Sequence, residues 1–200
     1  MLTTDVRAAA DALGGGRIVG IPTDTVYGLA ADPTRPGATA ALFTAKARPT
    51  DLELPVLVAD VEQANALAGP DGLPPVASRL AERFWPGALT IVVRRRPGLE
   101  WDLGGDDRTI GVRCPAHDVA RTLCATVGPL ATTSANRHGE PALTSAAGLA
   151  AAFGPELLVL DGGRCEGTPS TVVDASGAPL RCLRQGAVSW AEIEQVAAGS

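Results

Sequence analysis

Aromatic residues are scarce in this sequence, with three Trp, one Tyr and three Phe among 200 residues. Aliphatic side chains must therefore form most of the core, and a platform for stacking nucleic-acid bases is disfavoured. The chain carries 17 basic and 22 acidic residues, which gives a formal net charge of −5. Proteins that grip a long nucleic-acid backbone usually carry excess positive charge, so non-specific polynucleotide binding is disfavoured as the main activity.

Lysine occurs only once, at Lys46, and every other basic residue is an arginine. GC-rich coding sequence is sufficient to explain this bias. The four cysteines form no C-x-x-C pair, and Cys114 with His117 has no second pair at zinc-ligand spacing. A structural zinc site is therefore disfavoured, and we expect no metal-ligating cluster. We expect the cysteines to be buried, reduced thiols.

Long hydrophobic runs are also absent. The longest charge-free segments, 122–136 and 141–155, are shorter than a membrane span and rich in Ser, Thr, Gly or Pro. The first 17 residues carry Asp5, Arg7 and Asp11 and lack the apolar core of a secretory signal. We therefore expect a cytoplasmic protein that does not associate with membranes.

The hydrophobic share of 46% and the length of 200 residues suit one folded domain. Hydrophobic periodicity and turn residues predict an alternation of helices and strands. Both β-α-β and strand–strand connections occur, which predicts one α/β domain with a mixed β-sheet. The predicted helices are 6–13, 38–46, 61–68, 75–84, 118–127, 144–153 and one capped by Ser189; the predicted strands are 17–21, 54–59, 89–94, 109–113, 130–133, 157–161, 170–174 and 180–183.

The common nucleotide-binding and hydrolase motifs are missing. The chain has no G-x-x-x-x-G-K-[ST], H-E-x-x-H or G-x-S-x-G motif, and the glycines at 14–16 precede a predicted strand instead of linking a strand to a helix. His117 and His138 have no evident Ser or Cys nucleophile as a partner. The standard hydrolase constellations are therefore disfavoured.

Polar residues gather instead at the ends of predicted strands, where α/β sheets usually bind ligands. Segment 22–29 (PTDTVYGL) follows the first strand, and segment 132–136 (TTSAN) ends a later one. Each segment either orients a small polar ligand or forms a turn that caps the following element.

Cations accompany these polar segments. Lys46 and Arg48 end a predicted helix, where they either clamp a polyphosphate or neutralise the helix C-terminus. Arg113 shares one strand face with Thr109 and binds either an anionic ligand or an Asp. Segments 170–174 and 183–186 repeat the combination of a hydroxyl and an arginine, whereas 94–96 (RRR) is interpreted as a solvated loop. The inventory suits a phosphate-bearing substrate and catalysis by positioning and charge stabilisation.

Seven motifs in this order resemble the YrdC-like threonylcarbamoyl-AMP synthase family, in its single-domain form. They are PTDTVYGL (22–29), KARP (46–49), FWPGALT (84–90), TIGVRCP (109–115), SANRHG (134–139), STVVD (170–174) and LRQG (183–186). The match covers about residues 17–187 of one domain, 1–200. The resemblance implies an α/β fold in which a twisted mixed β-sheet, flanked by helices, lines a large concave cationic cavity.

The implied activity is that of a nucleotidyltransferase, which joins L-threonine, bicarbonate or CO2, and ATP into L-threonylcarbamoyladenylate and releases pyrophosphate. Mg2+ would accompany ATP. A separate threonylcarbamoyl transferase would then complete the N6-threonylcarbamoyladenosine modification of tRNA, and a direct contact with tRNA is a further expectation.

The same resemblance assigns roles to individual residues. It implies that Lys46 and Arg48 face the triphosphate as the catalytic pair. It implies that L-threonine is contacted by Thr25, Arg113, Thr132 and Ser170. It implies that the nucleotide is contacted by Thr109, Ser134 and Arg184. Asn136 would shape the loop in which it lies and reach phosphate or metal.

Three positions depart from the family pattern. Leu52 and Leu57 stand where some members place an Asn that contacts ATP and a His that contacts threonine, and Gln185 stands where Pro is frequent. Two alternatives stay open. One is a non-catalytic RNA-binding factor in translation or ribosome maturation. The other is the related domain of hydrogenase-maturation carbamoyltransferases, which uses carbamoyl phosphate.

Overall fold

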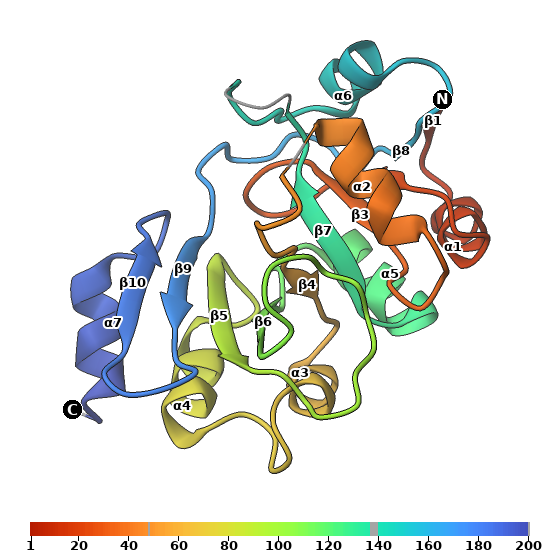
Figure 1. Ribbon diagram of the computed structural model, residues 1–200. Coiled ribbons are helices and arrows are strands. Elements are labelled where there is room, and N and C mark those ends of the chain that lie inside the picture. The colour runs from red at the N-terminus through yellow and green to blue at the C-terminus, as the bar shows by residue number, and fades with distance from the viewer. Residues whose placement is uncertain (48, 137–139, 200) are drawn as a thin grey trace.

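The computed structural model describes residues 1–47, 49–136 and 140–199. In this part of the chain, ten strands form one mixed sheet in the order β1-β8-β2-β3-β7-β4-β6-β5-β9-β10 (Figure 1). Their bounds are β1 Leu2–Thr3, β2 Val19–Ile21, β3 Gly28–Ala31, β4 Val56–Leu57, β5 Leu89–Arg94, β6 Thr109–Arg113, β7 Leu130–Ser134, β8 Leu158–Leu160, β9 Thr171–Asp174 and β10 Arg181–Arg184.

The pairing is parallel for β1 and β2 with β8, for β4 with β6 and for β5 with β9, and antiparallel for the other neighbours. The predicted mixed sheet is thus confirmed. Seven helices flank it in the described residues, namely α1 Val6–Gly14, α2 Ala38–Lys46, α3 Val61–Leu67, α4 Pro75–Phe84, α5 Asp118–Val127, α6 Ala146–Phe153 and α7 Trp190–Ala197.

Helices cover both faces of the part of the sheet that is formed by β1, β8, β2, β3 and β7. Leu13 of α1 and Leu123 of α5 join Val19 and Ile21 in one core cluster. The intervening Gly20 faces the other way, because a Cβ built on it would lie 2.4 Å from Leu149 of α6. Leu42 of α2 belongs to the same core cluster as Leu149, so α2 and α6 pack on the face opposite to α1 and α5. At the C-terminal end of the sheet, α4 packs against α7.

Local capping explains where several helices begin. The side chain of Asp60 accepts a hydrogen bond from the backbone N–H of Gln63 and caps α3, and Ser189 with Glu192 forms the predicted capping box of α7. Helix α1 differs from the prediction because Asp5, and neither Thr3 nor Thr4, caps it by accepting a hydrogen bond from the backbone N–H of Arg7.

Two further features contradict the sequence analysis. Three cysteines are buried as expected, but Cys182 is exposed, because β10 is an edge strand. Arg95 is also buried, whereas segment 94–96 was expected to be a solvated loop. Its Nη2 donates to the carbonyl of Trp101, so the side chain lies beneath the loop that follows it. No helix in the described ranges has the length and apolar character needed to cross a membrane.

Candidate functional site

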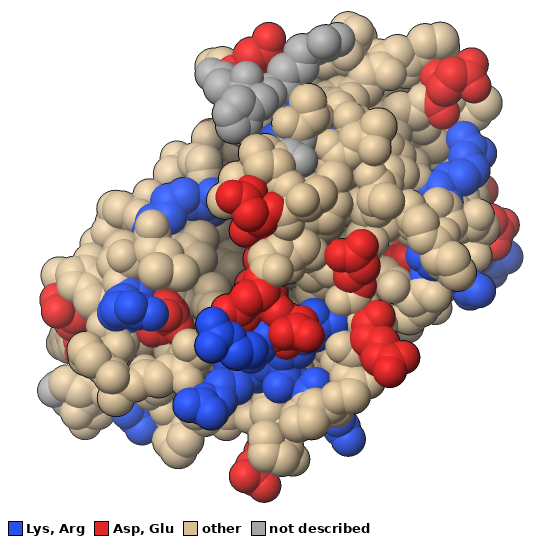
Figure 2. All heavy atoms as spheres, viewed as in Figure 1, with Lys and Arg blue, Asp and Glu red and all other residues tan. Residues whose placement is uncertain are grey.

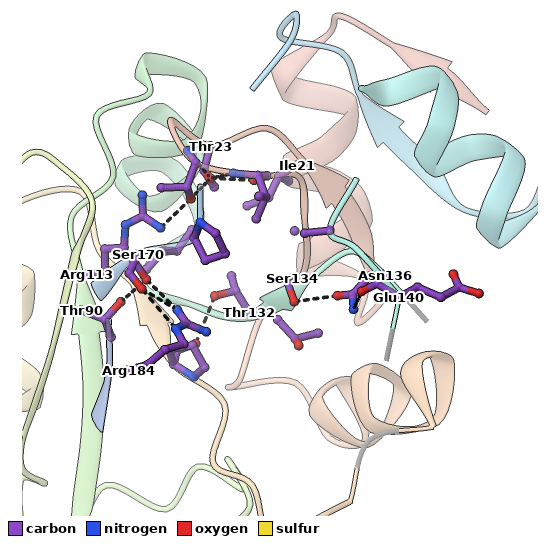
Figure 3. A pocket seen from close by; sticks show the side chains of 18 residues that line it. Ile21, Thr23, Thr90, Arg113, Thr132, Ser134, Asn136, Glu140, Ser170 and Arg184 are labelled. Atoms are coloured by element: carbon purple, nitrogen blue, oxygen red, sulfur yellow. Dashed lines mark hydrogen bonds between the residues drawn. The ribbon is translucent and has the colours of Figure 1, made fainter. Parts of the chain in front are cut away.

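A cavity of about 300 Å³ lies over the middle strands of the sheet (Figure 3). In the space-filling view, the surface is hollowed between the part that carries β9 and β10 and the part that carries β7 (Figure 2). The cavity walls come from segments that are far apart in the sequence, and they are rich in hydroxyl groups. The lining residues are Ile21, Thr23, Thr25, Val26, Gly28, Pro55, Leu57, Thr90, Arg113, Thr132, Thr133, Ser134, Asn136, Glu140, Ala142, Pro169, Ser170 and Arg184.

Lys46 is the last residue of α2, and only 7% of it is exposed. The helix ends there because Ala47 adopts the left-handed conformation, with φ 49°. The Lys46 ammonium lies within hydrogen-bond distance of four neutral oxygens on β7 and the turn after it. These are Thr133 Oγ1 at 3.2 Å, Ser134 O at 2.9 Å, Ser134 Oγ at 2.8 Å and Asn136 Oδ1 at 2.9 Å. The charge therefore lies next to three residues that line the cavity, namely Thr133, Ser134 and Asn136.

Arg113 ends β6, lines the cavity and is 7% exposed at its side chain. Its Nε donates to Gly87 O at 2.9 Å, its Nη1 to Thr25 Oγ1 at 2.9 Å, and its Nη2 to Asp24 Oδ1 at 2.7 Å. Burial lowers the pKa of Arg113, and the Asp24 carboxylate acts in the opposite direction. The predicted pairing of Arg113 with an Asp is thus confirmed, and because Arg113 also faces the cavity, its binding of an anionic ligand stays a prediction.

Arg184 faces the same cavity from β10. Its Nη2 donates to Ser170 O at 2.8 Å and to Ser170 Oγ at 3.1 Å, and Ser170 Oγ lies 2.9 Å from Thr90 Oγ1 (Figure 3). Gly186 permits this close approach, because a Cβ built on it would lie 2.3 Å from the carbonyl oxygen of Pro169.

A register irregularity in β10 gives Arg184 its direction. Arg184 pairs with Val172 and Cys182 with Val173, so two steps along β10 match one step along β9. Such a bulge interrupts the alternation of side chains between the two faces. Arg181, paired with Asp174, therefore shares a sheet face with Arg184 although the two are three residues apart.

The structure brings together most of the predicted site residues. Seven of them line the cavity, namely Thr25, Arg113, Thr132, Ser134, Asn136, Ser170 and Arg184. Lys46 contacts two of these seven residues, Ser134 and Asn136. Thr109 is not among the lining residues, and its hydroxyl donates instead to Glu53 Oε2 at 3.3 Å. Its contact with the nucleotide stays a prediction. Arg48 lies outside the described residues.

Two of the three departures from the family pattern, Leu52 and Leu57, lie in different places. Leu57 is buried and forms an apolar part of the cavity wall, whereas Leu52 is 45% exposed and is not a lining residue.

Sequence reasoning did not assign three residues that belong to this site. Asp24 pairs with Arg113, Thr90 joins Ser170, and Glu140 lines the cavity. Asp24 and Thr90 lie inside motifs that the sequence analysis quoted, so their segments were identified although their roles were not. Glu140 directly follows the SANRHG motif, and this position is the only feature of the sequence that indicates a role in the site.

The oxygen donors of the cavity suit a hard cation. Glu140 is the one carboxylate among the described lining residues, whereas the side-chain oxygens of Ser134 and Asn136 already accept hydrogen bonds from the Lys46 ammonium. No cluster of three or more His, Cys, Asp or Glu side chains that could hold a metal occurs in the described parts of the chain. Mg2+ usually binds through one or two carboxylates together with substrate phosphates and water, so this donor set fits Mg2+ that arrives with a nucleotide.

Comparison with known proteins identifies the family. The sequence model of the Sua5/YciO/YrdC family, described as "Telomere recombination", matches residues 11–186. The chain belongs to this family. A protein of Mycobacterium leprae is 43% identical over 195 residues, which cover 96% of this chain and 87% of that protein. The threonylcarbamoyl-AMP synthase of Chromohalobacter salexigens is 40% identical over 184 residues, covering 88% of this chain and 96% of that protein.

Solved structures of this family share the fold. The structure of Sua5 from Pyrococcus abyssi complexed with L-threonine superposes with a TM-score of 0.88 at 40% identity. The match covers 96% of this chain but 56% of the Pyrococcus chain, so this chain corresponds to little more than half of that protein. Escherichia coli YciO, at 21% identity and a TM-score of 0.82, shows the same fold.

Proposed function

We propose that this chain is an L-threonylcarbamoyladenylate synthase, an enzyme of the nucleotidyltransferase class. The observation that carries the proposal is the convergence of Lys46, Arg113 and Arg184, from three distant segments, on one cavity. The threonylcarbamoyl-AMP synthase of Chromohalobacter salexigens, which the match covers over 96% of its length, supports it. The substrates would be L-threonine, bicarbonate or CO2, and ATP.

Arg113 is suited to hold the threonine carboxylate. A guanidinium has five N–H groups, of which three are used by Gly87, Thr25 and Asp24. One N–H remains on each terminal nitrogen, and this pair matches the two oxygens of a carboxylate. Hydroxyls of Thr25, Thr132 and Ser170 line the same space and are positioned to recognise the threonine side chain. A site that hydrogen-bonds a substrate hydroxyl rejects analogues that lack it.

Lys46 is suited to hold phosphate oxygens beside Ser134. Its ammonium is buried against neutral oxygens, so a phosphate that enters next to Ser134 and Asn136 would meet a cation in a setting of reduced solvent screening. Arg184 would contact the nucleotide from the opposite wall. We keep Arg48 as a second triphosphate contact on the strength of the KARP motif.

The reaction needs no covalent bond to the enzyme. The neutral threonine amine attacks the carbon of CO2, and the proton that it loses leaves to solvent as the carbamate forms. A carbamate oxygen then attacks the α-phosphorus in line while the bond from that phosphorus to the bridging oxygen breaks, which releases pyrophosphate. Lys46 and Arg48 would stabilise the charge that accumulates on the leaving group.

Glu140, the carboxylate among the described lining residues, is the residue that would hold Mg2+ in this site. When bound, the ion would neutralise charge on the phosphate oxygens. The threonylcarbamoyl group of the product is activated by the adenylate, so a transferase that delivers it to tRNA is the expected consumer.

Pyrophosphate release tests the proposal. The purified chain with ATP and Mg2+ should release pyrophosphate only when L-threonine and bicarbonate are both present, and mass spectrometry should detect threonylcarbamoyladenylate. Omission of bicarbonate and replacement of threonine by carbamoyl phosphate are the controls. Release with carbamoyl phosphate alone would favour the carbamoyltransferase alternative, and binding of RNA without turnover would favour the RNA-binding alternative.

A further inference from the structure

Asp24 is the acidic member of the turn that follows β2, and it does not line the cavity. Its side chain is 15% exposed. One of its oxygens, Oδ1, accepts two hydrogen bonds, from Arg113 Nη2 at 2.7 Å and from the backbone N–H of Ala116 at 3.1 Å. Asp24 therefore joins the turn after β2 to the segment between β6 and α5, and it does so at the guanidinium that faces the cavity.

Two further contacts complete the hold on Arg113. Thr25 Oγ1 accepts from Nη1, and Thr25 is itself fixed because its backbone N–H donates to Thr23 Oγ1 at 3.2 Å. On the other side, Gly87 O accepts from Nε, and the N–H of Gly87 donates to Cys114 O at 2.9 Å. Each of the three guanidinium nitrogens thus has one acceptor that belongs to an anchored segment.

This arrangement has two physical consequences for an incoming carboxylate. The orientation of the guanidinium is fixed before the ligand arrives, so little rotational entropy is lost when the ligand binds. The Asp24 carboxylate also compensates the charge of Arg113, which weakens the attraction for a second carboxylate. The geometry of Asp24 therefore favours binding of the incoming carboxylate, whereas its charge opposes that binding.

We propose that Asp24 is a positioning residue that aims the two remaining N–H groups of Arg113 at the carboxylate of the amino-acid substrate. The proposal deepens the function proposed above and rests on it. Asp24 acts through Arg113, and the position of its Oδ1, more than its charge, is what the substrate requires.

Two variants separate geometry from charge. Asp24→Asn keeps an oxygen at the same place and removes the charge, whereas Asp24→Glu keeps the charge and moves it by one methylene. Dissociation constants for L-threonine, for its amide and for ATP are measured by isothermal titration calorimetry. Asp118→Asn is the control, because Asp118 pairs with Arg121 in an exposed ion pair outside the cavity.

We expect Asp24→Asn to bind L-threonine within about threefold of the unaltered protein, and Asp24→Glu to bind it at least about tenfold more weakly, since displacement by about 1 Å is sufficient for losses of this size. Binding of ATP and of L-threonine amide, which has no carboxylate, should stay unchanged in both variants.

The reverse order of the two variants, or an equal loss for L-threonine, its amide and ATP, would overturn the proposal. Binding of L-threonine by both variants as tightly as by the unaltered protein would also overturn it. If the unaltered protein binds no L-threonine, the proposed function itself fails, and this result is distinct from the others.

Discussion

Lys46 and Asn136 are joined by a hydrogen bond of 2.9 Å from Nζ to Oδ1, although 90 positions separate them in the sequence. The bond connects the end of α2 to the turn after β7. It places the single lysine of the chain beside residues that line the cavity. The ammonium, Ser134 and Asn136 therefore form one polar unit, in which a change at one residue alters the other two.

Lys46→Ala should lower the rate of pyrophosphate release at saturating ATP by about 100-fold or more, the scale of losing one preorganised charge contact in a transition state. Single-turnover measurement of adenylate formation provides the test. Lys46→Arg serves as the charge-preserving control, and the thermal midpoint of each variant shows whether it is folded. Turnover near that of the unaltered protein in a folded Lys46→Ala variant would contradict the role given to Lys46.

Arg184→Met should raise the KM for ATP by about tenfold, because it removes a cation from the cavity wall and the donors to Ser170. Arg181→Met is a matched control on the same strand. Arg181 is 68% exposed at its side chain, pairs with Asp174 and does not line the cavity. Steady-state kinetics with ATP as the varied substrate distinguishes the two variants, and an equal KM in both would exclude Arg184 as a nucleotide contact.

Because of Glu53, the free energy of unfolding should decrease as the pH rises. The pKa of Glu53 is raised from 4.5 to about 7, and burial of the carboxyl group is the largest cause. The charge of Asp106 adds to this rise, whereas the hydrogen bond from Thr109 and the charge of Arg95 oppose it. The folded protein therefore binds this proton more tightly than the unfolded chain does. The contribution of Glu53 to stability is fully present below the unfolded pKa of 4.5 and is lost as the pH rises through about 7.

The Glu53→Gln variant, which cannot titrate at this position, should show a smaller decrease in the free energy of unfolding between about pH 5 and pH 8. Urea denaturation at several pH values gives the comparison. Parallel pH profiles for the two proteins would show that the carboxyl of Glu53 does not titrate as described.

Local signals made much of the fold predictable. Strand β5 and strand β6 occupy the predicted ranges, and Ser189 caps α7 as its capping box indicated. Strand β3 was missed because it reads Gly-Leu-Ala-Ala, which has neither β-branched residues nor alternation. Strand β1 was missed because two residues next to a helix carry no periodic signal. Strand β1 depends on pairing with the distant β8, and β3 lies between the neighbouring β2 and the distant β7.

The site was predictable to the extent that motifs mark it. Spacing placed Arg113 at the end of a strand, but only the fold could show that Asp24 is its partner across 89 positions. The face on which Arg184 lies could not be predicted, since strict alternation from Arg181 places it on the wrong side. Thr109 shares a strand face with Arg113, yet the two lie four positions apart along an extended strand, and Thr109 contacts Glu53 instead.

The bulge in β10 also affects the outer border of the sheet. An uninterrupted strand at that position would offer a regular row of backbone donors and acceptors to any passing chain, with Leu183 exposed beside it. The irregular spacing at 182–184 breaks this row, and at the opposite border β1 is only two residues long. The same extra residue that turns Arg184 inward therefore discourages other polypeptides from adding to the sheet and so limits aggregation.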